Sequence, residues 1–230
     1  MDIVFNKVSK RFGRNWAIEN LSFTAESGKI TGLLGRNGAG KTSALRVLVG
    51  LENATEGTAT IGGSLFDDLP VGTVGVALSP FFPPMRTVMQ QLSLSALAGG
   101  ATRTDVERTL VETELAEVSH KRCMSLSLGM KQRLLLACAT VYSPKVLILD
   151  EPVNGLDPDG IVWLHKFLRM QASRGVSVLV SSHFLHDLQT YVDKVVIIQR
   201  TSLWQSQWPA ADGESLETLF SRVTAGIGVR

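Results

Sequence analysis

The residues whose types and spacing most clearly indicate chemistry lie in one glycine-rich segment, Gly35-Arg36-Asn37-Gly38-Ala39-Gly40-Lys41-Thr42. This segment matches G-x-x-x-x-G-K-[ST], in which the glycines let successive backbone N–H groups surround phosphate oxygens. The apolar run Ile30–Leu34 precedes it, and a helical pattern that ends at Gly50 follows it. An ordinary glycine turn explains the glycines, but it does not explain a Lys-Thr pair at the start of a helix. The spacing therefore predicts a phosphate-binding loop between a strand and a helix.

Lys41 and Thr42 have distinct expected roles in such a loop. The Lys41 ammonium group would reach the β- and γ-phosphates, and the Thr42 hydroxyl would be a ligand of Mg²⁺. The candidate nucleotide-binding residues of the segment are Gly35, Asn37, Gly38, Ala39, Gly40, Lys41, Thr42 and Ser43.

Two acidic residues, Asp150 and Glu151, directly follow the apolar run Val146–Leu149. Carboxylates at the end of a buried strand are costly unless they are solvated, paired or bound to a metal. At the carboxyl end of a parallel sheet they face the ligand crevice. Asp150 is therefore a candidate Mg²⁺ ligand, and Glu151 is a candidate to polarise the water that attacks the γ-phosphate. A solvated acid pair is the alternative interpretation.

A histidine, His183, follows the run Val176–Ser182 and so stands at the end of a further expected strand. Taken alone, a histidine at such a position more often has a structural role than a chemical one.

Together with three further motifs, these residues resemble the nucleotide-binding subunit of ATP-binding cassette (ABC) transporters. Leu126-Ser127-Leu128-Gly129-Met130 stands where the family has its LSGGQ signature, and Asn154-Gly155-Leu156-Asp157 fits the D-loop. His183 fits the switch histidine. Phe12 fits the aromatic residue that stacks on adenine, with Trp16 as the alternative. The resemblance covers essentially the whole chain.

The resemblance implies ATP and Mg²⁺ as cofactors and ATP hydrolysis as the activity. The catalytic residues that it implies are Glu151, His183 and Lys41, with Thr42 and Asp150 as metal ligands. In the family, two chains enclose two ATP molecules, so Ser127 and Gly129 would bind the nucleotide of a second chain. Asp157 would link the two sites. Whether the second ABC subunit is identical or different stays open.

The resemblance also implies a separate transmembrane permease subunit as a partner. The segment Leu128–Arg133 reads LGMKQR, which resembles the subgroup of bacitracin and lantibiotic-immunity exporters. Ser215–Phe220 resembles the closing segment of many export-type ABC-2 subunits. The implied function is export of a drug, a peptide antibiotic or a lipid-like substrate.

Two departures from the family pattern are expected to matter. The signature reads LSLGM, which keeps Ser127 and Gly129 but loses the first glycine and the glutamine. After the run Val74–Leu78, Ser79 stands where the family has its Q-loop glutamine. Its shorter side chain is expected to reach Mg²⁺ only through a water and to slow hydrolysis. The apolar segment Phe81–Met85 that follows is either a contact for the membrane subunit or part of the local core.

The elements that must position these groups are short apolar strands alternating with helices, which indicates a parallel sheet covered on both faces. The period-two pattern of residues 20–26 predicts a half-buried strand. Between residues 87 and 142 no strand is expected, and Thr104-Asp105-Val106-Glu107 fits a capping box that begins a helix with Val106, Leu110, Leu115 and Val118 on one face. A further helix is expected over 130–139.

The predicted fold is α/β: a P-loop NTPase (RecA-like) core with a mostly parallel sheet, an N-terminal antiparallel β lobe and an inserted α-helical lobe. A single ABC ATPase domain would span residues 1–230. The core and the β lobe would occupy about 1–80 and 143–210, the helical lobe about 81–142, and a C-terminal segment about 211–230.

Composition excludes several classes of function. Lys and Arg number 23 against 21 Asp and Glu, a formal net charge of +2 with no basic run, so nucleic acid is not an expected partner. No apolar stretch approaches the roughly 18 residues of a membrane helix. The N-terminus lacks the pattern of a signal peptide. The expected location is cytoplasmic and peripheral, on the inner face of the cell membrane.

Two alternatives to a transport ATPase belong to other functional classes. A non-transport ABC ATPase that acts on a macromolecule generally has two fused cassettes or a long coiled coil, and this chain has neither. A GTPase would offer the D-x-x-G of Asp157–Gly160, but the guanine-reading N-K-x-D is missing.

Overall fold

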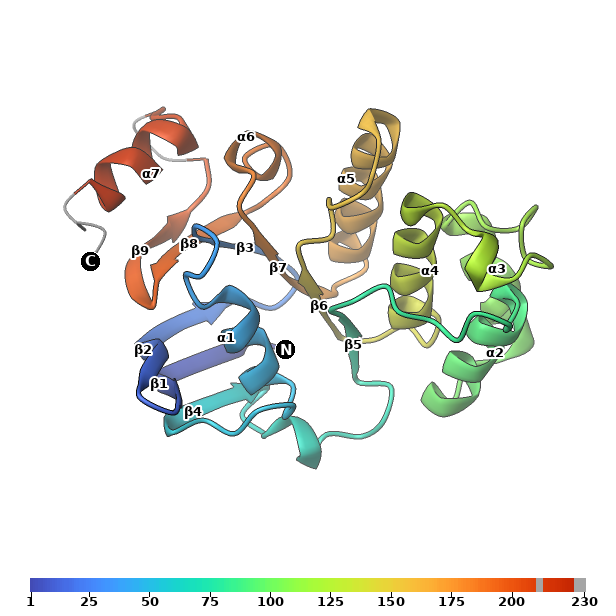
Figure 1. Ribbon diagram of the computed structural model, residues 1–230, viewed down its shortest axis with the longest axis horizontal. Helices are drawn as coiled ribbons and strands as arrows, with labels where there is room; N and C mark the ends of the chain where they lie inside the picture. The colour runs from blue at the N-terminus through green and yellow to red at the C-terminus, as the bar shows by residue number, and fades with distance from the viewer. Residues whose placement is uncertain (210–212, 226–230) are drawn as a thin grey trace.

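Two sheets with different strand directions form the framework of the chain (Figure 1). The structure is a computed structural model, and it describes residues 1–209 and 213–225. The strands are β1 (Ile3–Phe12), β2 (Asn15–Ala25), β3 (Ile30–Leu34), β4 (Glu56–Ile61), β5 (Val74–Ala77), β6 (Val146–Asp150), β7 (Ser177–Ser182), β8 (Lys194–Gln199) and β9 (Thr201–Gln207). The α-helices are α1 (Lys41–Leu48), α2 (Val88–Gly99), α3 (Arg103–Glu112), α4 (Leu128–Thr140), α5 (Pro158–Ser173), α6 (Leu185–Leu188) and α7 (Leu216–Thr224).

The smaller sheet is antiparallel and has the order β2-β1-β4 within the described residues. The alternation in β2 has the predicted effect: Leu21, Phe23 and Ala25 are buried, while the residues between them are less so. The strand begins at Asn15, earlier than the pattern indicated, because β1 and β2 form a hairpin that pairs Phe12 with Asn15. This sheet is the predicted β lobe.

The larger sheet has the order β5-β6-β7-β3-β8-β9 in the described part of the chain. Its strands pair in parallel from β5 to β8, and only β9 is antiparallel to its neighbour. The prediction of a mostly parallel sheet is confirmed. Because parallel strands end at the same edge, the carboxyl ends of β3, β6 and β7 come together although they are far apart in sequence.

Both faces of the larger sheet are covered, which explains its uninterrupted apolar strands. Helix α1 lies between the two sheets (Figure 1), where Leu45 and Leu48 join a core with residues of β1, β2 and β4. The opposite face packs against α4, α5 and α7, with Leu164 and Leu168 at 0% exposure. The phosphate-binding segment therefore follows a strand, β3, that is packed on both faces.

The helices α2, α3 and α4 form a separate group beside the sheet (Figure 1), within the range 81–142 that the sequence predicts for a helical lobe. They have their own buried cluster, to which Val88, Leu92, Leu110 and Leu134 belong. Burial raises the pKa of the Cys138 thiol in this lobe to about 11.

The predicted start of α3 is wrong by two residues. The capping box uses Thr102 and Asp105, not Thr104 and Glu107: the Thr102 hydroxyl accepts a hydrogen bond from the Asp105 N–H, and the Asp105 carboxylate accepts one from the Thr102 N–H. The helix also ends earlier than predicted. Glu114 has a positive φ of 56°, which breaks the helix, so Leu115 is buried from the following turn and not from α3.

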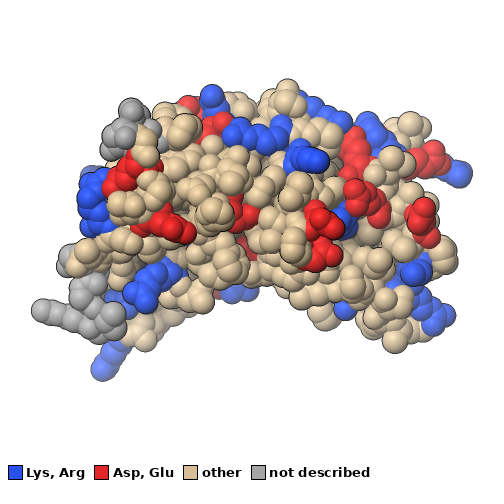
Figure 2. Space-filling model, turned by 90° about the horizontal axis from the view of Figure 1, so that it is seen from above, with Lys and Arg blue, Asp and Glu red and all other residues tan. Residues whose placement is uncertain are grey.

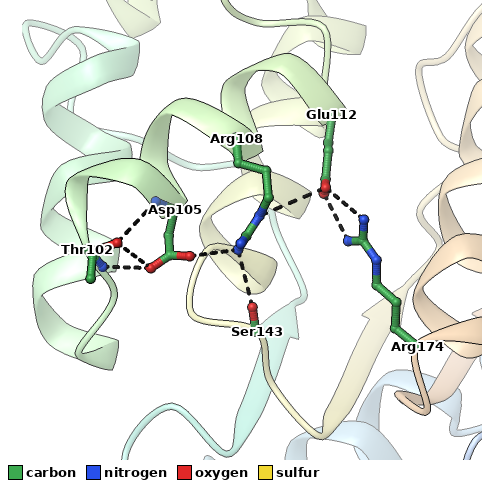
Figure 3. A network of polar contacts seen from close by, with 6 residues as sticks. All are labelled: Thr102, Asp105, Arg108, Glu112, Ser143 and Arg174. Atoms are coloured by element: carbon green, nitrogen blue, oxygen red, sulfur yellow. Dashed lines mark hydrogen bonds and ion pairs between the residues drawn. The ribbon is translucent and has the colours of Figure 1, made fainter.

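A polar network joins the helical lobe to the core (Figure 3). The Glu112 carboxylate on α3 accepts two hydrogen bonds from the Arg174 guanidinium after α5, at 2.8 and 3.2 Å. Arg108 contacts Asp105 at 2.9 Å and donates to the Ser143 hydroxyl before β6. Hydrogen bonding to Glu112 raises the pKa of Arg174 above its usual value. The network fixes where α3 sits relative to the sheet.

The surface has a mixed charge on the face that Figure 2 shows, where basic and acidic side chains alternate without a wide area of one sign. No helix in the described ranges is long and apolar enough to cross a bilayer.

We predict that Glu112→Gln lowers the free energy of unfolding by about 1 kcal/mol, because it removes the charge of a bidentate pair whose acid is only 18% exposed. Urea unfolding followed by tryptophan fluorescence measures this difference. The matched control is Glu107→Gln, which breaks a surface-exposed pair with Arg103 and should leave stability nearly unchanged. Equal losses in the two variants would contradict the prediction.

Candidate nucleotide-binding site

The phosphate-binding segment forms a tight loop whose shape depends on glycine. Gly40 has φ 99°, and a Cβ atom there would lie 2.5 Å from the Ala17 carbonyl oxygen. Gly40 is also the N-cap residue of α1 and provides no side-chain cap. The first N–H groups of α1 therefore remain available for an anion, on which the positive end of the helix dipole also acts.

The Lys41 side chain contacts both the first residue of the loop and the residue after β6. Its Nζ atom donates to the Gly35 carbonyl oxygen at 2.7 Å and lies 3.0 Å from Glu151 Oε1. The Lys41 side chain is only 6% exposed, and a buried ammonium group needs such partners because leaving it unpaired is expensive. The loop and the end of β6 are thus held together by one cation.

Asp150 is held by two hydroxyl groups. Thr42 donates to Asp150 Oδ2 at 2.8 Å, and Ser181 on β7 donates to Asp150 Oδ1. A hydroxyl and a carboxylate oxygen therefore converge at the start of α1, which is a donor set that suits Mg²⁺ when phosphate oxygens and waters complete its shell. The residues present fit the metal that the family resemblance implies.

Glu151 adopts an uncommon backbone conformation, with φ 49°. Its N–H donates to Ser181, with the hydroxyl at 3.0 Å and the carbonyl oxygen at 3.2 Å. This turn directs the side chain away from the sheet, where its second oxygen lies 2.8 Å from His183 Nδ1. Glu151 therefore bridges Lys41 and His183.

These groups line one pocket of about 370 Å³. Its lining residues are Ala17, Arg36, Asn37, Gly38, Ala39, Gly40, Lys41, Thr42, Ser43, Glu151, Asn154 and His183. The structure thus brings together the predicted loop, the predicted acid and the predicted histidine. Gly35 contributes its carbonyl group to Lys41, and Asp150 lies next to Thr42.

Other predicted site residues lie elsewhere. Phe12 ends β1 with 46% of its surface exposed, and Trp16 lines a different pocket. Neither is among the lining residues of the phosphate pocket. Ser79 is exposed after β5 and is not among them either. Their roles stay predictions.

The signature and the D-loop each provide the N-cap residue of a helix. Ser127 is the N-cap of α4 and accepts a hydrogen bond from the Met130 N–H at 3.2 Å. The predicted helix start at 130 is wrong, because α4 begins at Leu128 and includes Gly129 in its first turn. Asp157 is the N-cap of α5 and accepts from the Gly160 N–H at 2.8 Å.

Sequence reasoning missed Ser181, which contacts both acidic residues. The signal was present: two serines, Ser181 and Ser182, end an apolar strand immediately before His183. Ser181 can contact Asp150 and Glu151 only because β6 lies next to β7. The sequence alone did not specify that pairing. Ala17 on β2 also lines the pocket and was not predicted, and Asn154 was predicted as part of the D-loop but not as a lining residue.

A glycine loop at a helix start, an acidic pair after a neighbouring strand and a histidine after the next define a P-loop nucleotide-binding site. The family model "ABC transporter" matches residues 18–154. The chain belongs to the ABC transporter family, which confirms the resemblance found in the sequence.

Several known proteins are similar to this chain. The bacitracin transport ATP-binding protein BcrA of Enterococcus faecalis is 34% identical over 85% of the chain, and the match spans 66% of BcrA's own length. The SkfA peptide export ATP-binding protein SkfE of Bacillus subtilis (strain 168) is 36% identical over 86% of the chain and 85% of its own. A solved ATP-binding subunit of an ABC transporter matches with a TM-score of 0.87 and 27% identity, over 97% of this chain and 100% of its own.

We predict that Ser181→Ala weakens Mg²⁺-dependent binding of a fluorescent ATP analogue about tenfold, since a hydrogen bond to a carboxylate contributes about 1.5–3 kcal/mol. Without the hydroxyl, Asp150 loses one donor and Glu151 loses one acceptor. Titration of the analogue at fixed Mg²⁺ measures the change.

The control is Ser177→Ala at the other end of the same strand. Ser177 is equally buried and its hydroxyl donates to the Met1 carbonyl oxygen at 2.8 Å. This variant should lose stability but keep the affinity for the analogue. An unchanged affinity in Ser181→Ala would contradict the prediction.

Proposed function

We propose that this chain binds and hydrolyses ATP and thereby powers export through a separate membrane subunit. The observation that carries the proposal is the contact of Glu151 with both Lys41 and His183 at the phosphate pocket. Membership of the ABC transporter family supports it.

The chain's own residues account for the expected steps. The N–H groups at the start of α1 bind the β- and γ-phosphates, and Lys41 Nζ moves from Glu151 to phosphate oxygens of opposite charge. Glu151, released from Lys41, orients a water and accepts its proton. His183 holds the Glu151 carboxylate in place from the other side.

Thr42 and Asp150 would hold Mg²⁺, in agreement with the convergence of their oxygens at 2.8 Å. When bound, this ion neutralises charge on the phosphate oxygens. Ser181 keeps the Asp150 carboxylate oriented for that role.

The proposed transport direction and substrate class come from the relatives. SkfE and BcrA are named as a peptide export protein and a bacitracin transport protein. We propose a peptide antibiotic or a similar amphiphilic compound as the substrate, and a cytoplasmic location on the inner face of the membrane. Two copies of the chain would enclose two ATP molecules, with Ser127 and Gly129 of each facing the nucleotide of the other.

The contact with the membrane subunit is proposed at the segment Phe81–Met85 and the neighbouring face of α2. Phe81 is 84% exposed and Met85 is 61% exposed. An open groove of about 710 Å³ continues this surface along α2, past Met89 and Leu97. Phe82, in contrast, packs against the core of the helical lobe. Of the two roles that the sequence left open, the structural one applies to Phe82, and we propose the partner contact for Phe81.

We predict that Glu151→Gln lowers ATP turnover about 10²–10⁴-fold, the usual contribution of a general base, while ATP affinity is kept because Lys41 loses a competing charge. Phosphate release and equilibrium binding of ATP are measured on the same preparation. Glu52→Gln is the matched control, since Glu52 pairs with Lys10 at 2.9 Å away from the pocket. Turnover within tenfold of the unsubstituted protein would refute the role of Glu151.

We predict that Phe81→Ser reduces recovery of the co-expressed membrane subunit at least several-fold, because the substitution removes the most exposed aromatic side chain of the proposed contact. Binding of ATP should be unchanged. Val111→Ser on α3 serves as the control, since Val111 is also exposed, at 69%, but lies outside that contact. Full recovery of the complex with Phe81→Ser would overturn the proposed docking site.

A further inference from the structure

Leu128, the first residue of α4, packs directly on the backbone of Gly155 in the loop between β6 and α5. A Cβ atom built on Gly155 would lie 2.3 Å from Leu128 Cδ2 and 2.4 Å from Leu128 Cγ. No real side chain fits into that space unless the leucine moves. Gly155 also has φ 82°, a conformation that glycine adopts without strain.

Leu128 is 55% exposed and stands where the family signature has a glycine. The next residue faces the same loop. A Cβ atom on Gly129 would lie 3.5 Å from the Gly155 carbonyl oxygen, an ordinary contact distance. Leu156 Cδ2 would lie 3.6 Å from the same Cβ atom, so the first turn of α4 rests on Gly155 and Leu156 of this loop.

The loop leads from Gly155 straight to the phosphate pocket. Asn154, the preceding residue, lines the pocket, and its N–H donates to the Glu151 carbonyl oxygen at 3.1 Å. The other end of the loop is fixed, since the Leu156 N–H donates to the Val153 carbonyl oxygen and Asp157 caps α5. Gly155 is thus next to a residue that lines the pocket, and that residue is hydrogen-bonded to Glu151.

We propose that Leu128 is a positioning residue that couples the helical lobe to the phosphate pocket of its own chain. A displacement of the first turn of α4 would carry Gly155 with the Leu128 side chain and so change the position of Asn154 and Glu151. The inference rests on the proposed ATPase function. It assigns to Leu128 an effect on hydrolysis within one chain, separate from the expected effect of Ser127 and Gly129 on the nucleotide of a second chain.

A double-mutant cycle tests the coupling. Gly155→Ala should lower kcat about tenfold and leave KM for ATP within about twofold, because the new methyl group and the Leu128 side chain cannot occupy the same space. Leu128→Gly in the same chain should restore kcat to within about threefold, since contacting residues show non-additive effects. If the effects of the two substitutions simply multiply, the proposal is wrong.

The control for backbone strain is Gly175→Ala. Gly175 has φ 87°, and a Cβ atom there would have no neighbour within 4 Å. Alanine at this position carries the same conformational penalty without a clash, so its melting temperature should fall while kcat stays within about twofold. A tenfold loss of kcat in Gly175→Ala would attribute the effect of Gly155→Ala to lost stability and overturn the proposal.

Leu128→Ala keeps the test decisive if Gly155→Ala does not fold. This single truncation removes the contact without adding an atom, and the exposed position makes a folding defect unexpected. It should lower kcat and leave KM unchanged, and Leu128→Met should retain activity. A rise in KM with unchanged kcat would show that Leu128 acts on nucleotide binding instead.

ATP-driven dimer formation, measured by gel filtration in a Glu151→Gln background, separates this proposal from the proposed function. Leu128→Ala should dimerise as well as the Glu151→Gln parent if Leu128 acts within its own chain. Loss of the dimer in Leu128→Ala alone would place its effect on the second chain and refute the proposal. Absence of ATP binding in the parent itself would refute the ATPase function and the coupling with it.

Discussion

The structure depends on the ion pair between Lys41 and Glu151 more than on any other single contact. Lys41 is nearly buried, so its charge needs a partner, and the Glu151 carboxylate provides one at 3.0 Å. The same carboxylate contacts His183. One acidic group thereby connects the glycine loop, the end of β6 and the end of β7. The P-loop is thus linked directly to the ends of β6 and β7.

The order of the strands in the larger sheet explains why Lys41, Glu151 and His183 lie close together. Strand β3 lies between β7 and β8, and β6 pairs with β7 in parallel. The carboxyl ends of these strands therefore place the loop after Leu34, the pair Asp150-Glu151 and His183 at one edge. The pairing of β6 with β7 also explains why Ser181 can bind both acidic residues. Residues far apart in the sequence form one site because neighbouring parallel strands end at the same edge of the sheet.

Local patterns predicted much of this arrangement and failed where tertiary context decides. The glycine loop, the acidic pair and the alternation in β2 are properties of short segments, and each was predicted correctly in position. The start of α3 was not, because Thr102 and Thr104 both have an acidic residue three positions later. The choice falls on Thr102 because Gly100, with φ 76°, ends α2 and leaves Thr102 extended. Ser181 was missed since its partners lie on a neighbouring strand.

The effect of Leu128, which replaces the first glycine of the signature, also depends on a neighbouring segment. Position 128 viewed alone is a lost glycine, and a loss of function would be the natural conclusion. In three dimensions the leucine fills the space that a side chain at position 155 would need. The two positions are therefore in direct contact and join α4 to the loop before α5. The leucine at position 128 thus adds a contact between α4 and the loop before α5 that a glycine would not make.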